Sequence, residues 1–242
     1  MTDEHQVRER LDFLKKEIRQ ITDREITIIA VTKTHPESIL DICANLEIRH
    51  IGENRIQELR SKIEKRLHLR NKFVIHCIGP VQSNKAKYLP GLADSLDSLD
   101  SFDLIEKIND RWDIPEKLNV LLQINCTSEE QKSGLSHDDK KSILNIANKC
   151  LQSGKISLQG FMTMGPTPLG DEDTNSLEYQ EKTRKAFIRL KNIRDEVSHE
   201  LGVSLPRLSM GMTHDYKIAI ECGSTEIRVG SLLFGFRQVF GV

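Results

Sequence analysis

The fold is decided by the stretch Ile28-Ile29-Ala30-Val31-Thr32-Lys33-Thr34-His35-Pro36. Its apolar, β-favouring residues run directly into a lysine, and the proline then opens a helical pattern. This order is typical of a buried parallel strand that is followed by its helix. Lys33 is therefore predicted at the carboxyl end of a strand, where ligands bind in parallel α/β folds and where an amine can attack a carbonyl. The alternative is a solvated lysine at a strand end.

The rest of the chain repeats this alternation. Each expected strand is a short apolar run, and turn residues separate the strands from helical patterns. The run at 93–99 suits a helix or a strand, and its place in the alternation favours a strand. The expected strands are 26–31, 48–51, 73–78, 93–99, 118–124, 156–161, 207–210 and 226–229.

Eight such units predict an α/β fold, a single (β/α)8 TIM barrel. Apolar side chains that recur every three or four residues from Val7 to Ile21 predict an extra helix before the first strand. A doubly wound open sheet is the competing architecture. No G-x-G-x-x-G follows the first expected strand, so the commonest cofactor signature of that architecture is absent.

Length and charge narrow the class of protein. The 242 residues are expected to form one domain, 1–242. The 35 basic and 36 acidic residues almost balance, and no basic stripe with aromatic residues is present, so a nucleic-acid partner is not expected. No stretch approaches the length of a membrane span and no targeting pattern opens the chain. The chain is therefore expected to be cytoplasmic, with no membrane partner, and monomeric.

Neither cysteines nor carboxylates predict a metal site. The cysteines show no paired spacing and are expected to be reduced and buried. They are Cys43, Cys77, Cys126, Cys150 and Cys222. A repeated set of carboxylates is interpreted as a solvated face and a helix start. These are Asp94, Asp97, Asp100 and Asp103.

An anion site is predicted after the last strands. TIM barrels often bind phosphate with the loops that follow strands seven and eight. Here those loops are 209–213 and 230–231, and each pairs a hydroxyl with a glycine, so backbone N–H groups can approach an anion. Ordinary capping residues and turn glycines are the alternative reading of each loop.

The predicted anion site suggests a role for Lys33. In a barrel the first strand closes against the last, so the amine of Lys33 would face the predicted phosphate site. A phosphorylated aldehyde that is bound as a Schiff base requires this arrangement. Pyridoxal 5'-phosphate (PLP) is the obvious candidate cofactor. Arg228 would face its ring, and a guanidinium can donate to the pyridine nitrogen but cannot accept its proton. An unprotonated ring is a poor electron sink, which favours holding the cofactor over carbanion chemistry.

Motifs along nearly the whole chain closely resemble the pyridoxal phosphate homeostasis protein family, in collinear order. They are Ile29-Ala30-Val31-Thr32-Lys33-Thr34, Ile51-Gly52-Glu53-Asn54, His76-Cys77-Ile78-Gly79-Pro80-Val81-Gln82-Ser83-Asn84-Lys85, Gln131-Lys132-Ser133-Gly134-Leu135, Gly160-Phe161-Met162, Leu208-Ser209-Met210-Gly211-Met212 and Gly223-Ser224-Thr225-Glu226-Ile227-Arg228-Val229-Gly230. The resemblance implies the barrel of the alanine racemase N-terminal domain.

The resemblance also implies roles for single residues. Lys33 would carry PLP as an aldimine, Arg228 would partner the pyridine nitrogen, and Lys132 would lie at the pocket mouth. The phosphate would be held by Ser209, Gly230 and Ser231 with backbone help near Met210, and the pocket near the ring would be lined by Asn54 and His76. No catalytic residue and no metal ligand is implied.

Three functions remain open at this point. The first is a non-catalytic protein that stores and delivers PLP, with apo forms of PLP-dependent enzymes as candidate partners. The second is a PLP-dependent enzyme such as an amino-acid racemase, which needs a second acid/base opposite Lys33. Alanine racemase takes that group from a further domain, for which this chain has no room. The third is a cofactor-free barrel enzyme that uses Lys33 as an aldolase-type amine on a phosphorylated sugar.

Overall fold

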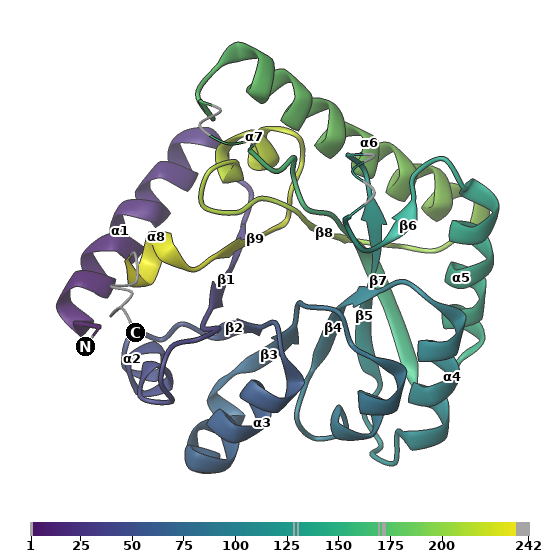
Figure 1. Ribbon diagram of the computed structural model, residues 1–242, viewed down its shortest axis with the longest axis horizontal. Helices are drawn as coiled ribbons and strands as arrows, with labels where there is room; N and C mark the ends of the chain where they lie inside the picture. Colours follow the sequence, from purple (N-terminus) through teal and green to yellow (C-terminus); the bar gives the residue numbers. More distant parts are fainter. Residues whose placement is uncertain (1, 128, 130, 169, 171–172, 236–242) are drawn as a thin grey trace.

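The barrel is closed and parallel in the computed structural model, which describes residues 2–127, 129, 131–168, 170 and 173–235 (Figure 1). Eight parallel strands pair in the order β1-β2-β3-β4-β5-β7-β8-β9, and β9 pairs with β1. A short additional strand, β6, pairs with β5. The strands are β1 (Thr27–Val31), β2 (His50–Glu53), β3 (Val74–Cys77), β4 (Ser95–Leu99), β5 (Leu118–Asn125), β6 (Leu135–Ser136), β7 (Ile156–Met162), β8 (Arg207–Ser209) and β9 (Glu226–Val229). The predicted (β/α)8 barrel is confirmed.

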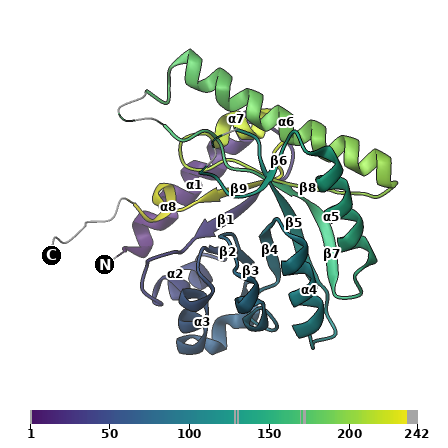
Figure 2. The same ribbon diagram turned by 45° about the vertical axis from the view of Figure 1, so that its right-hand side comes forward.

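Helices cover the outside of the barrel, and the longest, α6, packs over β7 and β8 (Figure 2). The α-helices are α1 (Glu4–Ile21), α2 (Ile39–Asn45), α3 (Ile56–Lys65), α4 (Phe102–Arg111), α5 (Lys140–Gln152), α6 (Leu177–Leu201), α7 (Tyr216–Glu221) and α8 (Ser231–Phe234). The 3-10 helices are η1 (Leu67–Lys72) and η2 (Ser83–Tyr88). Strand β3 is followed by the 3-10 helix η2 where an α-helix would be usual, because Gly79-Pro80 and Pro90-Gly91 bound that short segment on both sides.

The predicted burial of the cysteines is confirmed, since all five are buried. Within the described ranges, no helix combines the length and the apolar character that crossing a membrane requires.

The extra N-terminal helix is part of the packed structure. Helix α1 contacts α7 and α8, and its side chains Val7 and Leu14 are fully buried. We expect Leu14→Ala to lower the free energy of unfolding by about 2–5 kcal/mol, because it leaves a cavity under the helix. The neighbouring side chain, Phe13, is 57% exposed, so Phe13→Ala is the matched control and should change that free energy by less than about 0.5 kcal/mol. Urea denaturation followed by circular dichroism measures both, and equal small effects would show that α1 packs loosely.

Candidate functional site

A cavity of about 330 Å³ opens at the carboxyl ends of the barrel strands. Strand β1 contributes Val31, β7 contributes Met162 and β9 contributes Arg228, while most of the other polar lining residues lie after the strands. This is the end at which TIM barrels place their active sites, and the volume lies in the range of small-molecule sites. A larger groove of about 570 Å³ lies between α5 and α6, away from the strand ends.

Lys33 reaches the cavity from the end of β1. The preceding residue, Thr32, is buried and donates its hydroxyl to Glu53 Oε1 at 2.7 Å, while Lys33 itself is half-buried and lines the cavity. Thr34 follows with a φ of 62°, a conformation that a β-branched residue rarely adopts. The amine therefore stands on a rigid strand end next to a strained turn.

Arg228 is a buried cation at the base of the cavity, and its side chain is 5% exposed. Its guanidinium donates to Ser209 Oγ at 2.8 Å and to the carbonyl of Thr163 at 2.8 Å. Among the described residues no carboxylate forms an ion pair with it. Burial lowers the pKa of Arg228, because desolvation disfavours the charged form. A buried guanidinium beside a cavity favours an electron-rich or anionic ligand.

Two hydroxyl groups meet across the loops that follow β8 and β9. Thr213 Oγ1 lies 3.1 Å from Ser231 Oγ, and both residues line the cavity together with Gly230. A Cβ atom on Gly230 would lie 3.2 Å from the carbonyl oxygen of Val31, so the loop backbone packs closely against β1. The two loops therefore present two hydroxyls and a closely packed backbone at the predicted anion site, and this arrangement suits a phosphate.

Asp215 holds the backbone of the loop that carries Thr213. The backbone N–H of Met212 donates to Asp215 Oδ1 at 2.6 Å, and Asp215 is 3% exposed. Burial raises the pKa of Asp215, although the Met212 N–H opposes that rise. Asp215 occupies the N-cap position of α7, and Thr213 lies at the cavity.

The structure brings together most of the predicted site residues. The cavity is lined by Lys33, Asn54, Arg228, Gly230 and Ser231. Ser209 lies behind it, with its hydroxyl on Arg228. Met210 is fully buried outside the cavity, and its N–H donates to the carbonyl of Glu226. Lys132 donates to Glu129 Oε1 at 2.8 Å and to the carbonyl of Gly165 at 2.6 Å.

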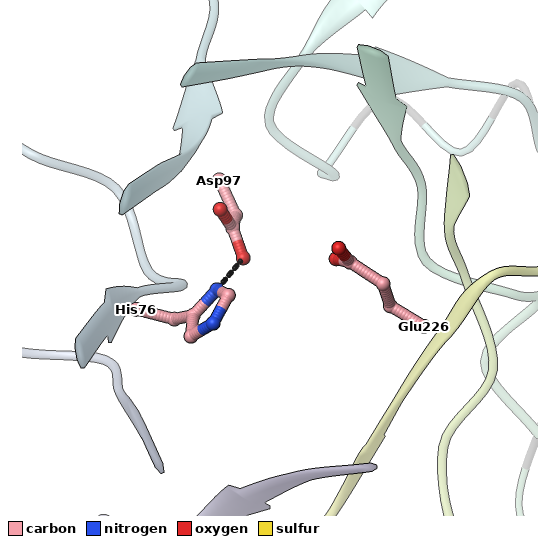
Figure 3. A group of neighbouring side chains, drawn as sticks. All are labelled: His76, Asp97 and Glu226. Atoms are coloured by element: carbon pink, nitrogen blue, oxygen red, sulfur yellow. Dashed lines mark hydrogen bonds and ion pairs between the residues drawn. The ribbon is translucent and has the colours of Figure 1, made fainter. Parts of the chain in front are cut away.

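His76 is placed away from the cavity, in an ion-pair cluster inside the barrel (Figure 3). His76 Nδ1 lies 2.8 Å from Asp97 Oδ2, and His76 Nε2 lies 3.0 Å from His50 Nδ1. Arg207 donates to Glu226 Oε2 at 3.0 Å and to Asp97 Oδ1 at 3.3 Å. The side chains come from β2, β3, β4, β8 and β9, so the cluster ties strands across the barrel.

The cluster corrects the interpretation of Asp97 as part of a solvated face, since Asp97 is 0% exposed. Burial opposes ionisation of this carboxyl, but His76 and Arg207 hold its pKa well below the usual range. Burial and the charge of His76 lower the pKa of His50 to about 4, so His50 is neutral at pH 7. His76, Asp97 and Glu226 form a donor set of the kind that binds metals, yet the Arg207 guanidinium already balances both carboxylates.

Several cavity residues are absent from the sequence prediction. They are Ile78, Gly79, Pro80, Gln123, Ser133, Met162, Met164 and His214, whereas Met212 and Thr213 belong to the predicted loop 209–213. Most of them lie at or just after the carboxyl ends of predicted strands. That position is the signal that could have found them, because it is where a TIM barrel collects its site.

Comparisons with known proteins agree with the fold. The family model described as alanine racemase, N-terminal domain, matches residues 6–238. The pyridoxal phosphate homeostasis protein of Aquifex aeolicus is 35% identical over 212 residues, which cover 87% of each chain. The human pyridoxal phosphate homeostasis protein is 33% identical over 87% of this chain and 76% of its own.

Solved structures extend the comparison. PipY of Synechococcus elongatus, solved with PLP bound, has a TM-score of 0.79 at 27% identity and matches over 95% of this chain and 100% of that chain. The alanine racemase of Clostridium difficile has a TM-score of 0.70 at 18% identity, over 97% of this chain and 61% of that one, which shows a shared fold.

Proposed function

Because this chain belongs to the pyridoxal phosphate homeostasis protein family, we propose that it holds PLP as a Schiff base on Lys33 and stores and delivers the cofactor. One observation carries the proposal: a single cavity collects an amine, a buried guanidinium and a pair of hydroxyls. These groups complement the aldehyde, the pyridine nitrogen and the phosphate of PLP. No catalytic reaction of its own is proposed.

The covalent step suits storage because it is reversible. The Lys33 amine would supply the nucleophile for the aldehyde carbon: a C–N bond would form, and the aldehyde oxygen would leave as water with the two amine hydrogens, so that PLP would be held as an imine. Addition of water to that imine restores both the amine and the aldehyde. The cavity is open to solvent at the strand ends, so water and cofactor share the same route.

Arg228 explains why the site would hold PLP without using it as an electron sink. A guanidinium stays protonated and has no acceptor, so it donates to the pyridine nitrogen and leaves the ring unprotonated. Its contacts with Ser209 and Thr163 hold the guanidinium at the base of the cavity. Carbanion chemistry gains most from a protonated ring, which this arrangement does not supply.

The phosphate role of the two loops gives a testable prediction. We expect Ser231→Ala to raise the Kd for PLP by about tenfold to a hundredfold, because a hydrogen bond to a charged group contributes about 1.5–3 kcal/mol. The imine absorbance at saturating PLP should not change, since Lys33 is untouched. Equilibrium dialysis measures the Kd. Ser61→Ala, at an exposed position on α3, is the control, and an unchanged Kd for Ser231→Ala would remove the phosphate role.

Delivery is tested by kinetics. The PLP-loaded chain is mixed with an apo-aminotransferase, and the return of transaminase activity is followed. Release into solvent is measured separately by dilution into a phosphatase that destroys free PLP. Storage with delivery predicts that activity returns faster than PLP is released. Equal rates would mean that the chain stores PLP but does not transfer it directly to the apo-enzyme.

Amino-acid racemisation is the second candidate function. His214 lines the cavity from a loop other than that of Lys33 and is a candidate second acid/base. Incubation of the loaded chain with L-alanine, followed by chiral chromatography, separates the two functions. Storage predicts that L-alanine stays enantiomerically pure, whereas formation of D-alanine that requires His214 would establish the racemase.

A further inference from the structure

Side chains behind the cavity converge on the backbone that carries Lys33. We propose that Glu53, Glu58 and Lys62 form a positioning network that holds the peptide groups on both sides of Lys33 and so directs its amine into the cavity. The network lies between β1, β2 and α3, outside the cavity lining. The inference rests on the proposed function, because it assigns the network to the residue that binds PLP.

Lys62 is the centre of the network. Its side chain is 6% exposed, and its ammonium donates to the carbonyl of Thr32 at 2.7 Å, to Glu53 Oε1 at 2.5 Å and to Glu58 Oε1 at 2.8 Å. An ammonium has three N–H donors, so these contacts use its full capacity. The carbonyl that precedes Lys33 is thereby fixed to a buried cation.

Glu58 binds the peptide group that follows Lys33. Its Oε1 accepts the backbone N–H of Thr34, the residue with the positive φ of 62°. A β-branched residue keeps such a conformation only where its surroundings impose it, and strain of this kind gathers at functional sites. Lys33 therefore lies between two peptide groups that are both bound by the same ion-pair network.

The composition of the network points to positioning more than to stability. Glu53 is 1% exposed, and burial raises its pKa although Lys62 opposes the rise. Among the described residues, Glu53 Oε2 is the one buried side-chain oxygen or nitrogen without a hydrogen-bond partner. A buried ion pair is often no more stabilising than apolar residues of the same volume. Well-packed apolar side chains could fill this space, but they could not bind the Thr32 carbonyl and the Thr34 N–H.

The first test uses the PLP-free chain. In Glu58→Ala, amide hydrogen exchange at Thr34, measured by NMR, should be about tenfold faster than in the wild type, because its N–H loses a charged acceptor. Glu58→Gln keeps an acceptor and should restore most of the protection. Glu64→Ala is the control on the same helix, where Glu64 forms an exposed pair with Arg60. Exchange at Thr34 that is equal in Glu58→Ala and Glu64→Ala would overturn the network.

The second test adds PLP. Glu58→Ala and Lys62→Met should form the imine at Lys33 about tenfold more slowly than the wild type, because a misplaced amine loses its orientation. Lys65→Met, an exposed position on α3, should match the wild type. Slowing in neither variant would overturn the positioning role. If the wild type forms no imine at Lys33, the proposed function fails, whereas the exchange test still decides whether the network holds Thr34.

Discussion

Lys33→Ala is expected to fold like the wild type and to show no imine absorbance when PLP is added. Lys33 is half-buried at the end of β1, so its truncation removes little packing, while it removes the amine that the cavity presents. We expect the visible absorbance to fall to that of free PLP, and some PLP to remain bound non-covalently through Arg228 and Ser231. Absorbance spectra after gel filtration and circular dichroism measure the two properties.

Two other lysines serve as controls for this result. Lys132 is held by Glu129 and the carbonyl of Gly165, and Lys85 lies near the ring of Tyr88. Lys132→Ala and Lys85→Ala should keep the imine absorbance. Persistence of the absorbance in Lys33→Ala, or its loss in either control, would contradict the assignment of Lys33.

Arg207→Met is expected to cause the largest loss of stability. Its guanidinium is 17% exposed and contacts both Asp97 and Glu226, whose carboxylates are buried in the barrel. Removal of one partner from a buried ion pair leaves uncompensated charge and costs about 3–5 kcal/mol. Methionine fills a similar volume, so the loss would reflect charge more than packing. Urea denaturation measures the free energy of unfolding.

Arg60→Met is the matched control for charge removal. Arg60 pairs with Glu64 at 2.6 Å on the exposed face of α3, and such surface pairs contribute about 0–1 kcal/mol. A loss in Arg207→Met as small as that of Arg60→Met would mean that water or a rearranged side chain compensates the carboxylates. It would also show that the cluster does not tie the strands together.

The barrel could be predicted from local pattern alone, except where charges replace apolar residues. Strand β1 is predicted because Ile28 to Val31 form an apolar run. Strand β4 is ambiguous because its polar side chains resemble a solvated face. The Asp97 carboxylate is in fact paired with His76 and Arg207, which are distant in sequence, and pairing across a barrel leaves no local signal.

The candidate site was predictable where a residue type and a strand end coincide. Lys33, Arg228 and Ser231 are found in this way, and all of them line the cavity. Thr213 lies in the predicted loop 209–213 but is not singled out as a site residue, because a hydroxyl before a helix is equally typical of an N-cap. The packed loops show that Asp215 takes that position. The role of the residues behind Lys33 depends on contacts between three elements, which no spacing reveals.

Borohydride reduction of the PLP-loaded chain, followed by peptide mapping, identifies the lysine that binds PLP. Reduction converts the imine into a stable secondary amine, so the phosphopyridoxyl group marks the lysine that bound the aldehyde. We expect one labelled peptide, which contains Lys33. A label on Lys132 or Lys85, or no label at all, would contradict it.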